Sequence, residues 1–142
     1  MKITIVSAGK PKEPFLSIFK EYTKRSGRFI KIEYLFLKDN KDFETKILNK
    51  KKGRLLILLD ENGKEYSSKQ FADFLIKEEQ LGKELLFVIG STNGHSKELK
   101  ENADFLISLS RFTFPHEFAL AIFSEVLYRS ISIKFAHPYH RE

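Results

Sequence analysis

The stretch FVIGSTNGHSKEL, residues 87–99, runs from an apolar strand through a glycine-containing loop into the start of a helix. Loops of this kind often bind phosphate, and two nucleotide motifs can be tested by their spacing. A dinucleotide fingerprint needs G-x-G-x-x-G, whereas this loop has only Gly90 and Gly94. A P-loop needs Gly-Lys-Ser/Thr, whereas Gly94 is followed by HSK. Neither motif fits, and the glycines could simply let the backbone turn out of the strand.

Strands and helices alternate along the whole chain. The continuous apolar run LLILLD, residues 55–60, predicts a strand that is covered on both faces. Alternation of strands with helices predicts an α/β fold with a mostly parallel sheet and helices on both faces. The expected strands are 1–8, 29–37, 55–60, 84–89 and 104–110, and the expected helices are 11–25, 39–52, one capped by Ser67 or Ser68 and ended by Gly82, one ending near 102, and 116–135.

The length and composition predict one domain, residues 1–142, with 42% hydrophobic residues available for a core. No run of roughly 18 apolar residues and no secretion leader is visible, so we expect no membrane span and a cytoplasmic protein. The absence of cysteine excludes disulfides and thiolate metal sites. Four histidines lack the spacing of a metal site, so we expect no metal.

Positive charge is concentrated in the first part of the chain. Residues 1–54 carry 15 Lys and Arg against 6 Asp and Glu, whereas residues 55–142 carry 10 against 13. This asymmetry indicates a surface that meets a polyanion, although a solvated basic face that only aids solubility would give the same pattern.

Ligands of parallel α/β sheets bind beyond the carboxyl ends of the strands, which predicts a site formed by 59–60, 90–94 and 109–114. These segments offer backbone and hydroxyl groups but no nucleophile paired with a histidine and a carboxylate. Asp60 is more simply explained as the cap of a turn toward Gly63 than as a reacting group. The segments therefore suit a neutral or zwitterionic nucleoside-like ligand between apolar walls.

The C-terminal residues AHPYHRE, 136–142, combine aromatic, imidazole and guanidinium groups. Such groups can stack on a nucleic-acid base and contact its phosphates. Alternatively, Tyr139 docks onto its own helix or onto a neighbouring subunit.

Five segments together resemble one enzyme family. They are KITIVSAGK (2–10), IG-x-x-NG (89–94), LSRFTFPHE (109–117), E-x-x-YR (125–129) and the final Tyr139-His140. These motifs are similar to those of the ribosomal large-subunit pseudouridine N3-methyltransferase H family, which is of the SPOUT type. The resemblance covers essentially the full chain and is strongest in residues 87–142.

The resemblance implies a deep trefoil knot near the C-terminus, a homodimer, and S-adenosylmethionine as methyl donor. It implies methyl transfer to N3 of a pseudouridine in the 23S (large-subunit) ribosomal RNA, free or within the ribosome. His140 would help to remove the N3 proton, while Tyr139 and Arg129 orient the base or screen charge. The implied donor-binding residues are Leu59, Gly90, Leu109, Ser110, Arg111, Phe112, Thr113 and Phe114.

Two further expectations come from individual segments. The final helix is apolar almost all round, and a domain of this size would struggle to cover it, which favours a dimer. The family has a second glycine where this chain has Ser91. If that position takes positive φ, serine costs roughly 1–2 kcal/mol and donor binding weakens.

Two rival functions are considered. A receiver-type signalling domain would need an acidic pair after the first strand, and VSAGK supplies none. A catalytically weak or silent RNA- or ribosome-binding module of the same fold would follow if Ser91 spoiled donor binding.

Overall fold

The computed structural model of the chain describes residues 1–91 and 93–141. Strands and helices alternate throughout this part, as the sequence predicts. In chain order they are β1 (Lys2–Ala8), α1 (Phe15–Ser26), β2 (Lys31–Leu37), α2 (Phe43–Lys50), β3 (Arg54–Glu65), α3 (Ser68–Gln80), β4 (Glu84–Ile89), α4 (Lys97–Asn102), β5 (Phe105–Ser108) and α5 (His116–Lys134).

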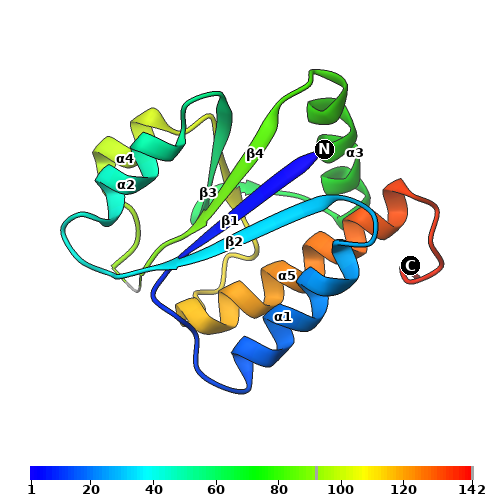
Figure 1. Ribbon diagram of the computed structural model, residues 1–142, viewed down its shortest axis with the longest axis horizontal. Coiled ribbons are helices and arrows are strands. Elements are labelled where there is room, and N and C mark those ends of the chain that lie inside the picture. The colour runs from blue at the N-terminus through cyan, green and yellow to red at the C-terminus, as the bar shows by residue number, and fades with distance from the viewer. Residues whose placement is uncertain (92, 142) are drawn as a thin grey trace.

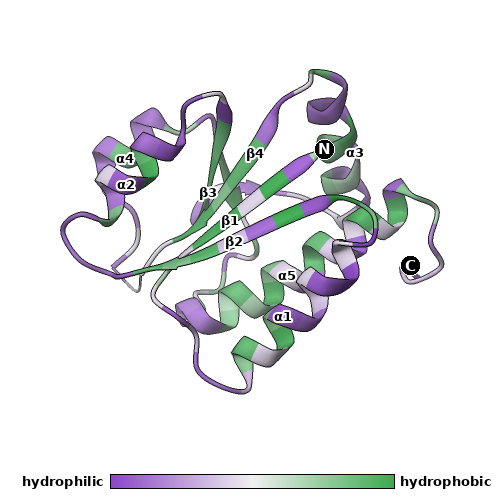
Figure 2. Cartoon of the chain, in the orientation of Figure 1, coloured by the Kyte–Doolittle hydropathy of each residue, from purple (hydrophilic) through white to green (hydrophobic). Residues whose placement is uncertain are grey.

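The strands form one sheet in the order β2-β1-β4-β3-β5, and every pair is parallel. Helices α1, α3 and α5 cover one face, and α2 and α4 cover the other, so the fold has three layers (Figure 1). Figure 2 shows mostly hydrophobic residues on the central strands and mostly hydrophilic residues in the connections between elements. The predicted α/β class is confirmed.

The central strands β3 and β4 are buried on both faces, as their continuous apolar sequences predict. Leu56, Ile57 and Leu58 are fully buried, and successive side chains point to opposite sides. Ile57 packs in the cluster under α1, α3 and α5, whereas Leu56 and Leu58 pack in the cluster under α2 and α4. A polar side chain on either face of β3 would therefore enter a core.

Several element boundaries differ from prediction because local geometry overrides the apolar pattern. Helix α1 begins at Phe15 rather than residue 11, since Pro14 occupies its N-cap and disfavours helical backbone in the residue before it. Helix α2 begins at Phe43 rather than 39, because the Asn40 side chain accepts a hydrogen bond from the backbone of Asp42 in a turn. Strands β2 and β5 are shorter than expected, at 31–37 and 105–108.

Strand β3 does not end at Asp60 as predicted but continues to Glu65. A register shift between Leu59 and Lys64 lets it bulge and then resume pairing with β5. Gly63 lies in this bulge, against the β5 backbone. A Cβ built on Gly63 would lie 2.6 Å from the carbonyl carbon of Leu106, so only glycine fits without a shift.

Helix α5 is covered more fully within one chain than its sequence suggests. Leu120, Phe123, Leu127 and Ile131 are buried in the cluster that includes α1 and α3. The argument that one domain could not cover this helix is therefore wrong for most of its length, although Phe118 remains exposed. Among the described residues, no helix combines the length and apolar character needed to cross a membrane.

We predict that Gly63→Ala lowers the free energy of unfolding by about 1–3 kcal/mol, because the added methyl group must displace the β5 backbone. Urea denaturation followed by circular dichroism measures this change. Gly27→Ala is the control, since Gly27 has helical φ and ψ of −61° and −13° that alanine adopts readily. Equal midpoints for Gly63→Ala and wild type would show that the close approach is not a constraint.

Candidate functional site

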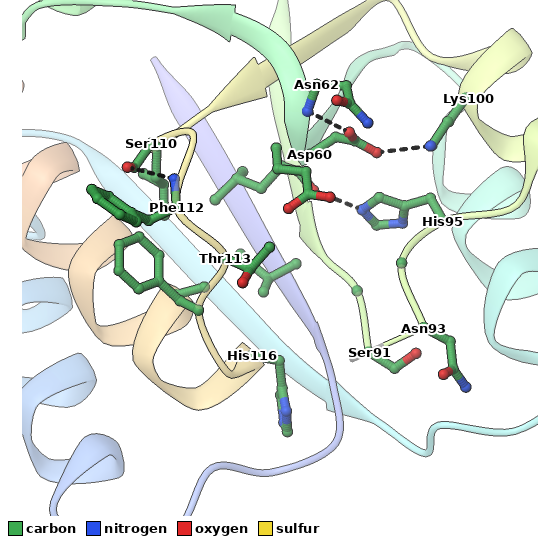
Figure 3. A pocket seen from close by; sticks show the side chains of 18 residues that line it. Asp60, Asn62, Ser91, Asn93, His95, Lys100, Ser110, Phe112, Thr113 and His116 are labelled. Carbon is green, nitrogen blue, oxygen red and sulfur yellow. Dashed lines mark hydrogen bonds and ion pairs between the residues drawn. The ribbon is translucent and has the colours of Figure 1, made fainter.

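A cavity of about 320 Å³ lies where β4 and β5 end and where β3 bulges after Leu59. All three segments that the sequence places at a common site contribute to its wall. Figure 3 shows the loop carrying Ser110, Phe112 and Thr113 facing His95 and Asp60 across the cavity. The predicted residues that line it are Leu59, Gly90, Leu109, Ser110, Phe112, Thr113 and Phe114.

Arg111 belongs to the same loop, but its side chain does not line the cavity. Its Nε donates to Oε1 of Glu65 at 2.8 Å, in an exposed ion pair that ties the loop to the end of β3. Seven of the eight expected residues thus line the cavity, whereas the Arg111 guanidinium points away from it toward Glu65.

The loop after β5 is bent by two short-range hydrogen bonds. Ser108 Oγ donates to the Ser110 carbonyl at 2.8 Å, and the Phe112 N–H donates to Ser110 Oγ at 3.0 Å. This bend leaves Phe112 80% exposed at the rim of the cavity, with Phe114 39% exposed. Large apolar side chains left in water at a cavity rim indicate a surface that another molecule covers.

His95 is a wall residue whose role the sequence did not reveal. Its Nε2 lies 3.0 Å from the Leu59 carbonyl oxygen, a contact that links the loop after β4 to the end of β3. A Cβ built on Gly90 would lie 2.7 Å from Cε1 of the His95 ring. Glycine is therefore required at position 90, because the His95 ring leaves no space for a side chain there. Gly90 itself indicated a crowded position, but nothing in the sequence identified His95 as the neighbouring side chain.

Burial lowers the pKa of His95 below its ordinary value. The hydrogen bond to the Leu59 carbonyl and the carboxylates of Asp60 and Glu44 act in the opposite direction but do not outweigh burial. His95 is accordingly a neutral ring near pH 7, and its Nε2–H donates to the carbonyl.

Asp60 has the turn-capping role that the sequence favours. Its Oδ1 accepts the Asn62 N–H at 2.8 Å, and its Oδ2 pairs with Nζ of Lys100 at 3.0 Å. Burial alone would raise the pKa of Asp60, but the bonds from Asn62 and Lys100 outweigh it and lower that pKa. Asp60 is an ionised, fully engaged carboxylate that holds the bulge of β3 against α4.

The expected backbone penalty at Ser91 does not arise. Ala136, with φ of 54°, is the one non-glycine residue of positive φ in the described part of the chain. Ser91 therefore adopts an ordinary backbone conformation, and its neighbour Gly90 also lacks positive φ. Thr92, in the same loop, lies outside the described residues. This correction removes the conformational reason for a binding module that had lost its donor site, although the Ser91 side chain still lines the cavity.

The C-terminal residues fold back onto α5 and form a polar network with it. Glu125 Oε1 accepts from Arg129 Nη2 at 2.6 Å and from the Tyr139 hydroxyl at 3.0 Å. Arg129 Nη1 lies 3.2 Å from Nδ1 of His140. The Tyr139 ring packs at 4.6 Å from that of Tyr128, and burial first, then hydrogen bonding, raises the pKa of Tyr139. Docking of Tyr139 onto its own helix is thus observed.

This network and the cavity lie at opposite ends of α5. His116, the first residue of α5, lines the cavity, whereas Arg129 lies 13 residues later in the same helix. That separation corresponds to roughly 20 Å along the helix axis. Figure 1 shows the chain ending at the far end of α5. One chain therefore does not bring Arg129, Tyr139 and His140 to the cavity.

The chemistry of the wall is that of binding rather than of a reacting metal or nucleophile. Within residues 1–91 and 93–141, no group of three or more His, Cys, Asp or Glu side chains could hold a metal ion. The cavity offers main-chain groups, hydroxyls, aromatic rings, histidines and the paired Asp60 and Lys100. Such a wall suits an organic ligand that supplies its own reactive group.

A family model described as predicted SPOUT methyltransferase matches residues 1–140. The chain belongs to the SPOUT methyltransferase family. It is 38% identical to the ribosomal RNA large subunit methyltransferase H of Caldicellulosiruptor bescii, over 98% of this chain and 99% of that protein. It is 31% identical to the protein of the same name from Thermus thermophilus, with 99% of both chains covered.

A solved structure supports the fold. A probable methylase family protein from Haemophilus influenzae has a TM-score of 0.60 at 10% identity, over 99% of this chain and 70% of the other. The comparison at this identity bears on the fold alone.

We predict that the free energy of unfolding falls as the pH is lowered below about 6.5, the ordinary pKa of histidine. Below that pH the unfolded chain takes up a proton that folded His95 does not bind, so acid favours unfolding. His95→Gln keeps a hydrogen-bond donor toward Leu59 but does not titrate. Urea denaturation at several pH values should show a shallower acid loss for His95→Gln, whereas parallel curves for the two proteins would contradict this role of burial.

Proposed function

We propose that this protein is an S-adenosylmethionine-dependent methyltransferase acting on N3 of a pseudouridine in large-subunit ribosomal RNA. The observation that carries the proposal is the 38% identity, over 98% of this chain, to a protein named ribosomal RNA large subunit methyltransferase H. The resemblance of residues 109–117 and 125–129, with Tyr139 and His140, to the family motifs supports pseudouridine as the base and N3 as the methylated atom. Residues 1–142 would act as one domain in the cytoplasm, and the trefoil knot of the family stays a prediction.

The cavity fits the donor in size and in chemistry. Its volume of about 320 Å³ lies in the range of small-molecule sites. S-adenosylmethionine supplies a methyl group carried on a positively charged sulfur. Gly90 allows the His95 ring to form part of the wall, and Phe112 and Phe114 can close the exposed side. The residues proposed to hold the donor are Leu59, Gly90, Leu109, Ser110, Phe112, Thr113 and Phe114, with Arg111 bracing their loop through Glu65.

The protein's main contribution to catalysis is alignment of donor and acceptor, which is worth several kcal/mol. The N3 proton of the base must also leave. Because guanidinium only donates, His140 Nδ1 accepts the hydrogen bond from Arg129 in this structure. For Nδ1 to accept the N3 proton, His140 must first leave Arg129. In this proposal Tyr139 and Arg129 orient the base or screen its developing negative charge.

A homodimer is required by this assignment. The tail of one chain lies at the far end of α5 from its own cavity. We therefore propose that the Arg129, Tyr139 and His140 groups of one protomer complete the cavity of its partner. Phe112, Phe114 and Phe118 are exposed near the cavity end of α5 and would be covered in such an assembly.

We predict that calorimetry detects one S-adenosylmethionine per chain. Thr113→Arg should abolish this binding, because the long cationic side chain would occupy the cavity and repel the sulfonium. Thr113→Ala is the control and should retain most affinity. Transfer of a labelled methyl group to large ribosomal subunits, with mass spectrometry of the nucleoside, tests the reaction. Donor binding that survives Thr113→Arg would place the site elsewhere.

We predict that His140→Ala retains donor binding but loses about a hundred- to ten-thousand-fold in methylation rate, the usual range for a lost general base. Mixing inactive His140→Ala with inactive Thr113→Arg should restore activity. In a mixed dimer, the intact cavity of one chain meets the intact tail of the other. Mixed chains that exchange subunits yet stay inactive would show that the tail acts on its own chain.

A further inference from the structure

A second concavity, of about 450 Å³, lies at the end of α5 that is remote from the donor cavity. It is bounded by the last turn of α1 and by the C-terminal tail. We call it the tail hollow and define it by Lys24, Arg25 and Arg28 on one side and Tyr128, His137 and Tyr139 on the other. Cationic groups thus face aromatic rings across one concave surface.

Within the part of the chain that the structure describes, two of the three cations of the tail hollow have no carboxylate partner. Lys24 and Arg28 are exposed, and neither forms an ion pair with any residue that the structure describes. Among the residues that the structure describes, Glu21 is the one carboxylate in the wall, and Arg25 pairs with it at 3.0 Å. An anion bound here would relieve the repulsion among these cations and would meet side chains that need not give up a partner.

On the aromatic side, the buried Tyr128 ring holds the more exposed rings of His137 and Tyr139 in place. The Tyr128 ring lies 4.6 Å from that of Tyr139 and 6.4 Å from that of His137. The Arg25 guanidinium lies over Tyr22 at 5.2 Å and Tyr128 at 5.9 Å, which fixes a cation beside these rings. Fixed rings next to fixed cations are the combination that binds unstacked bases together with their phosphates.

The tail hollow is also continuous with the groups proposed to act on the acceptor base. Tyr139 lines it and donates to Glu125 Oε1, which also accepts from Arg129. Arg129 in turn contacts His140. A strand of RNA lying in the tail hollow would therefore place its next nucleotide beside His140.

We propose that the tail hollow binds single-stranded ribosomal RNA next to the methylated nucleotide, with Lys24 and Arg28 on its phosphates and His137 against a base. This inference rests on the proposed function for the identity of the RNA. It assigns α1 the task of holding the substrate and gives a role to Lys24 and Arg28, two of the 15 Lys and Arg residues in the basic first part of the chain.

The test compares Lys24→Gln/Arg28→Gln with Lys46→Gln/Lys52→Gln. The second pair removes the same charge from exposed positions in and just after α2, on the other face of the sheet. Binding of purified large ribosomal subunits is measured at several potassium chloride concentrations without methyl donor. Protein-free large-subunit ribosomal RNA serves as competitor, and circular dichroism and donor calorimetry confirm that every variant is folded.

We expect Lys24→Gln/Arg28→Gln to bind roughly 10- to 30-fold more weakly at about 0.1 M salt. The slope of log affinity against log salt should fall by about 1.4, as two lost single-strand phosphate contacts require. Lys24→Arg/Arg28→Lys should bind like wild type, and so should the α2 pair. Equal weakening by both glutamine pairs, or none by the α1 pair, would overturn the proposal.

Two other outcomes separate this inference from the proposed function. Failure of protein-free RNA to compete would mean that the tail hollow meets a ribosomal protein, and the RNA assignment would be wrong. Tight binding by wild type without methyl transfer would contradict the proposed reaction, while the comparison of the two glutamine pairs would still decide whether the tail hollow holds RNA.

Discussion

The parallel pairing of β3 with both β4 and β5 is the constraint on which the rest of the site depends. Parallel strands end at the same edge, so three loops distant in sequence, after Leu59, Ile89 and Ser108, are forced to meet there. The pairing is held by burial on both faces, because β3 and β4 have apolar side chains in the clusters above and below the sheet. The bulge at residues 60–63 lets β3 leave the ladder at the cavity and rejoin β5 beyond it. A ligand site thus arises where the ladder is interrupted.

A glycine and a histidine set the shape of this site through the space they share. Gly90 leaves room for the His95 ring, and His95 in turn holds the Leu59 carbonyl. The Asp60–Lys100 pair then ties the same strand end to α4. The wall is therefore assembled from main chain fixed by buried or paired side chains, which costs little reorganisation when a ligand binds. Such a wall suits a protein whose contribution is alignment rather than a reacting side chain.

The sequence predicted features that depend on neighbouring residues, and it missed features that depend on contacts between residues far apart in the chain. Strand β4 has its predicted bounds, because the apolar pattern that predicts it lies entirely within six consecutive residues, Glu84–Ile89. The start of α1 was missed by four residues, since Pro14 overrides an apolar periodicity that extends past it. The continuation of β3 past Asp60 was missed because its partner is β5, more than 40 residues away. The three segments at the cavity followed from topology, but the His95–Leu59 contact joins residues 36 apart and leaves no local signal.

The spatial separation of the two ends of α5 has the largest consequence for function. The LSRFTFPHE segment and the Tyr139-His140 tail belong to one set of family motifs, but in the structure they lie at opposite ends of α5, where His116 and Arg129 are roughly 20 Å apart along the helix axis. The two ends differ in chemistry: one has a cavity with apolar rims, and the other has cations, rings and a histidine. Neither set of groups can be moved along a helix that is packed between α1 and α3. The rigidity of α5 is therefore an argument for a second copy, because only another chain can bring the opposite end of its own α5 to this cavity.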